Sequence, residues 1–129
     1  MSDIPQKTIA DPKTHYGSGR AAVRGFILQR LTGALNVLFT IFFAWFIIRV
    51  AGHDRATMVE RLHNPIVALL LAAMIVNVAV HMRIGMREVI EDYVHDERLN
   101  RLSLWLNTLF CALIVVASLA ALAKIVFWG

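Results

Sequence analysis

Apolar residues are gathered into three long blocks along this chain. The first block occupies residues 31–48, the second 66–80 and the third 104–123. At 1.5 Å of rise per residue, the first and third blocks give helices of about 27 and 30 Å, which match the hydrocarbon core of a bilayer. The blocks predict three transmembrane helices, with spans at approximately residues 27–49, 65–87 and 103–126.

The second block is too short to cross the bilayer by itself, since it provides only about 22 Å of helix. Asn64 and Pro65 suit the N-cap and the first helical position, so this helix begins there and has to be extended at its other end. The extension brings His81 into the membrane and is expected to reach Met86. Ser103 similarly suits the N-cap of the third helix.

The composition agrees with a membrane protein. Of 129 residues, 58% are hydrophobic and only 17% are charged. Three spans of about 20 residues would take up roughly half of this length, so a separate soluble domain is not expected. We expect an all-α, integral membrane three-helix bundle over residues 21–129, preceded by an N-terminal arm of residues 1–20. That arm has no apolar run typical of a cleaved signal peptide. Cys111 is expected to be a packing residue, because one cysteine forms neither an internal disulfide nor an iron–sulfur motif.

The distribution of basic residues predicts the orientation. The N-terminal arm, the start of the first helix and the second connection carry nine lysines and arginines: Lys7, Lys13, Arg20, Arg24, Arg30, Arg83, Arg87, Arg98 and Arg101. The other side carries four: Arg49, Arg55, Arg61 and Lys124. Because cytoplasmic flanks are enriched in lysine and arginine, the N-terminus is expected in the cytoplasm and the C-terminus outside. This asymmetry explains the net charge of +4, so nucleic-acid binding is not expected.

One stripe of the second helix carries the candidate chemistry. At about 100° per residue around the helix axis, the angular position of each member differs from that of His81 by at most about 40°. They are Asn77, His81, Gly85, Glu88 and Asp92. Arg83 and Arg87 fall on the other side of the helix, where they are expected to reach lipid phosphates or another subunit.

His81 is the most informative residue, because an ionisable side chain inside a membrane is costly and usually functional. Metal ligation is one interpretation, with Gly85 leaving space for a flat macrocycle; close helix packing around a hydrogen-bonded histidine is the other. A low-spin haem needs two axial ligands. The remaining histidines all lie in flanks or loops: His15, His53, His63 and His95. A second ligand is therefore expected from a partner chain.

Asp92 and Tyr93 stand just beyond the predicted span, at the cytoplasmic interface. A phenol there donates a hydrogen bond and a carboxylate relays protons, which would suit a quinone headgroup. The alternative is an interfacial aromatic residue beside a helix-end acid.

The string from His81 through Gly85-Met86 to Asp92-Tyr93-Val94 resembles the hydrophobic membrane anchor subunits of succinate dehydrogenase, respiratory complex II. A weaker match is Phe26-Ile27-Leu28-Gln29-Arg30 with Thr32, and the likeness covers residues 19–129. The companion cytochrome b556 anchor subunit has a similar pattern, matched by His81, Gly85, Arg87 and Asp92. The tyrosine directly after the aspartate, and the lack of an Arg-Pro-x-Ser-Pro-His opening, favour the hydrophobic anchor subunit.

The resemblance implies specific roles. His81 would be one axial ligand of a haem b shared with the cytochrome b556 subunit, and Tyr93 would hydrogen-bond a ubiquinone carbonyl with Asp92 beside it. Arg30 and Arg24 would approach the haem propionates or the quinone pocket.

The same resemblance implies a complex with a flavoprotein subunit and an iron–sulfur subunit, in a bacterial inner membrane and within the citric acid cycle and the aerobic respiratory chain. The chain has no dinucleotide fingerprint and no cysteine cluster, so it is expected to be a non-dehydrogenase subunit. A non-haem membrane scaffold remains the competing class; a transporter subunit has little support, because the chain has no internal repeat.

Overall fold

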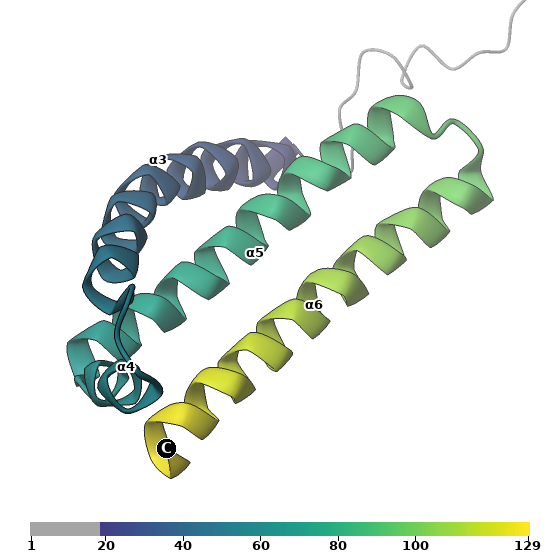
Figure 1. The fold of residues 1–129 in the computed structure, drawn as a ribbon. Helices are drawn as coiled ribbons and strands as arrows, with labels where there is room; N and C mark the ends of the chain where they lie inside the picture. Colours follow the sequence, from purple (N-terminus) through teal and green to yellow (C-terminus); the bar gives the residue numbers. More distant parts are fainter. Residues whose placement is uncertain (1–18) are drawn as a thin grey trace, which may run out of the picture.

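The computed structural model describes residues 19–129, which form four helices and, within that range, no strand (Figure 1). They are α3 (Gly19–Val50), α4 (Arg55–Leu62), α5 (Pro65–Tyr93) and α6 (Glu97–Trp128). The helices α3, α5 and α6 are each long and apolar enough to cross a membrane. The all-α class and the three membrane helices are therefore confirmed. The expected N-terminal arm, with His15, lies almost wholly outside the described residues.

The start of α5 follows the local sequence chemistry. Asn64 is the N-cap, its side-chain oxygen accepts a hydrogen bond from the Ile66 amide at 3.0 Å, and Pro65 is the first helical residue. Proline suits this position because its missing N–H would have no partner inside the helix. This boundary is confirmed.

The start of α6 differs from the prediction that Ser103 caps it. Asp96 is the N-cap, and its carboxylate accepts hydrogen bonds from the amides of Arg98 and Leu99 at 3.0 and 2.9 Å. Glu97 adds a negative charge in the first turn, where the helix dipole favours it. The helix therefore starts ahead of the apolar block, and Ser103 lies inside it.

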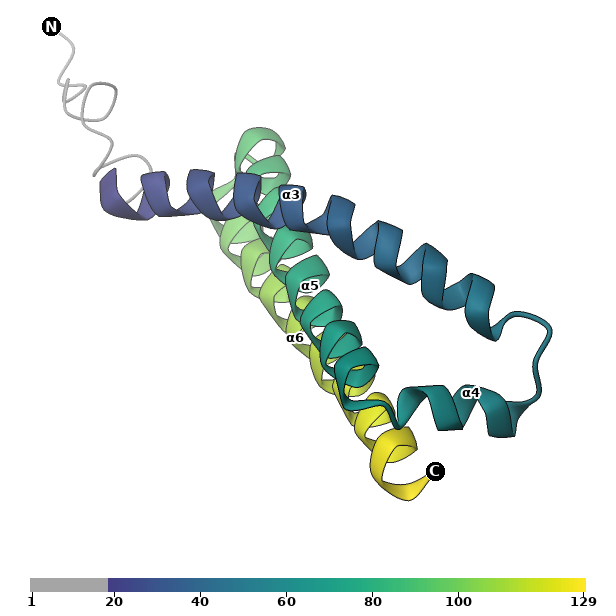
Figure 2. The same ribbon diagram turned by 90° about the vertical axis from the view of Figure 1, so that its left-hand side faces the viewer.

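The sequence prediction did not include α4, a short helix between α3 and α5 (Figure 2). It follows a turn at Gly52, whose φ of 78° is one that glycine adopts without strain. Asp54 is its N-cap, and hydrogen bonds from Thr57 hold the pKa of the Asp54 carboxyl below its ordinary value. Arg55 then donates to the Gly129 carbonyl at 3.1 Å, so this connection is tied to the end of α6.

The helix α5 packs against both other membrane helices. It runs beside α6 along its length, while α3 crosses it at an angle (Figures 1 and 2). Phe46 and Val50 of α3 pack with Leu71 of α5 in the buried apolar cluster. Most other large apolar side chains are exposed, as expected of helices that face lipid or partner subunits. The two faces of α5 therefore meet different neighbours, and three residues of the predicted stripe, Asn77, His81 and Gly85, lie on the face toward α3.

Candidate functional site

Part of the predicted stripe of α5 forms a polar contact with α3, here called the α3–α5 seam; Glu88 and Asp92 of the stripe are exposed and take no part in it. It consists of Gln29, Thr32, Gly33 and Asn36 from α3 and Asn77, His81 and Gly85 from α5. Glycine on both helices lets the backbones approach closely, which is typical of helix contacts in membranes. The seam gathers hydrogen-bonding groups within two largely apolar helices.

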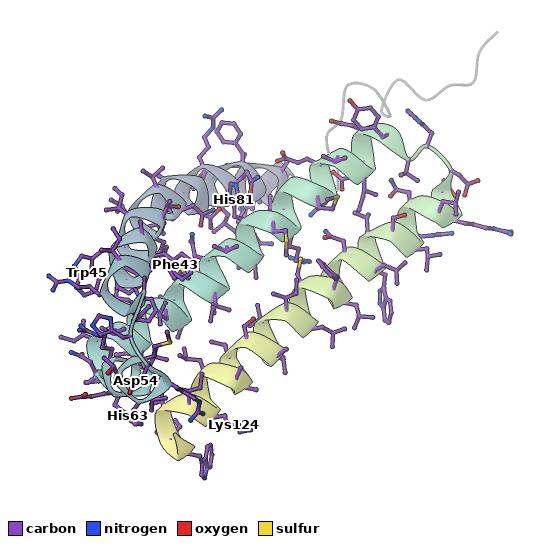
Figure 3. All side chains as sticks on the ribbon, viewed as in Figure 1. Phe43, Trp45, Asp54, His63, His81 and Lys124 are labelled. Carbon is purple, nitrogen blue, oxygen red and sulfur yellow. The ribbon has the colours of Figure 1, made fainter. Side chains whose placement is uncertain are left out.

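His81 lies on α5 at its contact with α3, and it is half-buried (Figure 3). Its Nδ1 is 3.0 Å from Oγ1 of Thr32, which is itself buried. A Cβ atom at Gly33 would lie 3.3 Å from the ring's Cε1. The imidazole therefore lies between the Thr32 hydroxyl and the backbone of Gly33, which has no side chain. Its other nitrogen, Nε2, forms no hydrogen bond with any residue in 19–129.

Asn77 fixes the same seam one turn away. Its Nδ2 donates to the Thr32 carbonyl at 3.0 Å and to Oδ1 of Asn36 at 2.7 Å. Polar groups inside a bilayer need such partners, because no water is available to them. The pair of bonds stabilises one register of α3 on α5, and that register also places Thr32 at His81.

The contact at Gly85 supports the packing interpretation of that glycine. A Cβ atom there would lie only 3.0 Å from Nε2 of Gln29, so the space beside Gly85 is filled by a side chain of α3. The Gln29 Oε1 is buried and has no hydrogen-bond partner within the described range. It remains available to a donor from outside this part of the chain.

Arg83 and Arg87 lie on the other side of α5, as predicted, but their contacts are within this chain. Nε of Arg83 donates to Oγ1 of Thr108 on α6 at 3.2 Å, and Nε of Arg87 pairs with Glu91 at 2.8 Å. The expectation that they reach phosphates or another subunit missed both partners: Thr108 comes from α6, which packs on that side, and Glu91 lies one turn further along α5 itself.

The two arginines predicted to approach a cofactor are not brought to His81. Arg30 is exposed and its guanidinium stacks over Phe26, 4.4 Å from the ring centre. Arg24 is exposed and borders a shallow apolar hollow on α3 with Val23 and Ile27. Neither contacts the seam, so their roles stay predictions.

Asp92 and Tyr93 end α5 as exposed residues, and Tyr93 is 78% exposed. Neither side chain forms a hydrogen bond within residues 19–129. The phenol and the carboxylate are therefore open to a ligand or a partner chain at this end of the helix.

The sequence interpretation missed one cavity. It has a volume of about 460 Å³ and lies where α3, α5 and α6 meet, with Phe26, Arg83, Glu88 and Thr108 among its lining residues. Such a cavity depends on how three helices pack, so no signal in the separate blocks could have revealed it.

The donor set suits a haem better than a metal ion bound by protein alone. Among residues 19–129 there is no group of three or more histidine, cysteine or carboxylate side chains that could hold an ion. A haem needs only one or two protein ligands, because its porphyrin supplies the in-plane nitrogens. His81, with Nδ1 hydrogen-bonded and Nε2 without a partner, fits one axial position.

Cys111 is buried, and its thiol donates to Oδ1 of Asn107, consistent with a packing role.

The chain is similar in sequence to known proteins of one family. The model of the succinate dehydrogenase/fumarate reductase transmembrane subunit matches residues 6–121. A succinate dehydrogenase hydrophobic membrane anchor subunit of Rickettsia conorii is 30% identical over 107 residues, covering 82% of this chain and 85% of its own length. One of Rickettsia felis is 32% identical over 99 residues, covering 75% and 81%. No solved structure matches.

The family match spans all three membrane helices except the end of α6. The curated relatives carry the name of the hydrophobic anchor subunit, which agrees with the resemblance found in the sequence. Together with the three apolar helices, they make this a multi-pass membrane protein. The chain belongs to the succinate dehydrogenase/fumarate reductase transmembrane subunit family, among its hydrophobic membrane anchor subunits.

Proposed function

We propose that this chain supplies one axial haem b ligand, His81, and part of the ubiquinone site of a succinate:ubiquinone oxidoreductase. It would share the haem with a cytochrome b556 anchor subunit and dock an iron–sulfur subunit and a flavoprotein subunit. On this proposal it has no dehydrogenase chemistry of its own. Its location would be a bacterial inner membrane, with the N-terminus cytoplasmic, as the distribution of basic residues favours.

The observation that carries the proposal is the hydrogen bonding of the two ring nitrogens of His81. A half-buried imidazole in a membrane helix has one nitrogen bound to Thr32 and the other without a partner in the described chain. Unpaired polar atoms are costly in lipid, so Nε2 is expected to meet a ligand or a partner. A metal-bound histidine has this arrangement, with its second nitrogen hydrogen-bonded to the protein.

A bound haem b would supply one-electron redox chemistry, and two imidazole ligands would leave it no open position for oxygen. Three other residues of the seam hold the histidine in place, directly or through Thr32. Thr32 holds its ring by one nitrogen, Asn77 holds the backbone of Thr32, and Gly33 gives the ring its space. Arg30 and Arg24 remain the candidates for approaching the haem propionates or the quinone pocket.

The proposed quinone end of the chain depends on exposed groups. Tyr93 and Asp92 stand together at the end of α5, and both are open. We propose that the Tyr93 hydroxyl donates to a ubiquinone carbonyl and that Asp92 serves proton delivery to the same site. Their exposure supports a pocket completed by partner subunits.

The direct test is to isolate the complex through a tag on this chain in mild detergent. We expect the flavoprotein, the iron–sulfur protein and a second anchor subunit to co-purify. The reduced-minus-oxidised spectrum should then show b-type bands. A complex with these partners but without haem would favour the non-haem scaffold interpretation, and the absence of the partners would contradict the assembly.

Tyr93→Phe tests the quinone role. Losing one hydrogen bond should cost about 0.5 to 1.5 kcal/mol, which is a few-fold to about a tenfold loss of quinone affinity. We expect succinate–quinone activity to show this change in the apparent KM for quinone. Electron delivery to a soluble dye should stay at the wild-type rate, which controls for assembly. An unchanged quinone response would count against the role of the phenol.

A further inference from the structure

We infer that the Thr32 hydroxyl selects the tautomer of His81, placing the imidazole proton on Nδ1 and leaving the lone pair on Nε2 for the iron. Thr32 is then a positioning residue that acts through His81. This inference rests on the proposed haem role of His81 and adds a group of α3 to it.

The first step is the neighbourhood of the Thr32 hydroxyl. Its oxygen lies 2.6 Å from the Leu28 carbonyl, 3.2 Å from the Gln29 carbonyl and 3.0 Å from Nδ1 of His81. A hydroxyl has one proton to donate and lone pairs with which to accept. Both carbonyl oxygens are acceptors only, whereas a ring nitrogen can donate or accept.

The second step assigns the protons. If the hydroxyl donated to Nδ1, its oxygen would face the Leu28 carbonyl oxygen at 2.6 Å with no proton between them. If it donates to Leu28, its lone pairs are free for an N–H of His81. The separations agree with this choice, since 3.0 Å is usual for an N–H···O bond and 2.6 Å lies within the range of about 2.5 to 3.0 Å for O–H···O bonds. The hydroxyl therefore donates to Leu28 and accepts from Nδ1–H.

The third step concerns the other nitrogen. In a neutral imidazole with its proton on Nδ1, Nε2 carries the lone pair. Nε2 has no hydrogen-bond partner in residues 19–129, so the helix pair leaves it available. Two other contacts keep the arrangement in register: Asn77 binds the Thr32 carbonyl, and the bare backbone at Gly33 accommodates the ring edge.

The hydrogen bond from His81 to Thr32 would change the electronic properties of a bound haem. A hydrogen bond donated by Nδ1–H increases the basicity of the ligating nitrogen, which favours the oxidised iron. Removing the acceptor should raise the midpoint potential of the haem. It should also weaken haem affinity by about 10- to 100-fold, as is common when the outer partner of a metal ligand is lost.

Thr40 offers a matched control on the same helix. Its hydroxyl makes the same kind of backbone contact, to the Asn36 carbonyl at 2.7 Å, but the residue is exposed and does not contact His81. Removing that hydroxyl tests what such a change does to α3 without touching the histidine.

The experiment uses the purified complex with Thr32→Val, Thr32→Ala, Thr32→Ser and Thr40→Val in this chain. Redox titration should show a raised haem midpoint potential in the Val and Ala variants of Thr32, and haem transfer to apomyoglobin should be faster. Thr32→Ser keeps the hydroxyl, so it should restore both values, and Thr40→Val should match the wild type.

Wild-type potentials and haem retention in both hydroxyl-free variants would overturn the inference, as would equal shifts in Thr32→Val and Thr40→Val. Those results would leave the proposed function standing, provided that the wild-type complex carries haem. A wild-type complex without haem would overturn both.

Discussion

Replacing His81 with alanine should remove the b-type absorption of the purified complex. The side chain provides the one imidazole among residues 19–129 that lies in the α3–α5 seam, and alanine offers no nitrogen to replace it. Loss of an outer partner of a metal ligand weakens binding by about 10- to 100-fold, so loss of the ligand itself should weaken haem affinity by at least that factor and leave the purified complex depleted of haem. The measurement is the reduced-minus-oxidised spectrum per unit of co-purified flavoprotein.

His53→Ala is the control for His81→Ala. His53 lies in the connection between α3 and α4, is exposed, and has its Nδ1 3.2 Å from the Ala51 carbonyl in the same connection. Its removal should leave haem content unchanged. Full retention of the b-type spectrum in the His81 variant would eliminate the axial role, whereas equal losses in both variants would indicate a general assembly defect.

The membrane helices could be predicted because their signals are local. A run of apolar residues fixes an approximate span, and Asn64-Pro65 fixes one helix start through its own backbone chemistry. Apolar runs do not determine how far a helix extends beyond the membrane into water, at either end. The helix α6 therefore begins at Glu97, capped by Asp96 and well before its apolar block, and α4 lies in a connection whose composition is polar.

The sequence predicted the residues that α5 contributes to the candidate site, but not those that α3 contributes. The period of the α-helix places Asn77, His81 and Gly85 on one stripe of α5 from the sequence alone. It does not tell which face of α3 meets that stripe, because this depends on crossing angle and register. Thr32 appeared in the sequence only as part of a weak motif, and its contact with His81 requires the packed helices.

Gly33 shows how sensitive that contact is expected to be. Gly33→Leu should displace His81, because even the first carbon of a side chain would lie 3.3 Å from Cε1 and 3.8 Å from Nδ1. The larger side chain cannot share that space with the ring. Overpacking of this kind costs about 1 to 3 kcal/mol, which is about fivefold to more than a hundredfold in an equilibrium constant. We expect haem affinity to fall by a factor in this range, observed as a lower haem content per co-purified flavoprotein.

Gly25→Leu and Gly33→Ala complete the series. Gly25 lies on the same helix, and a Cβ atom there would meet nothing within 4 Å, so its leucine variant should keep the wild-type haem content. Alanine at position 33 requires only a small shift of the ring and should give an intermediate value. Because both leucine variants change the helix propensity of α3 alike, a difference between them reports the space at His81. Equal haem content in the two leucine variants would mean that Gly33 does not control the position of the ring.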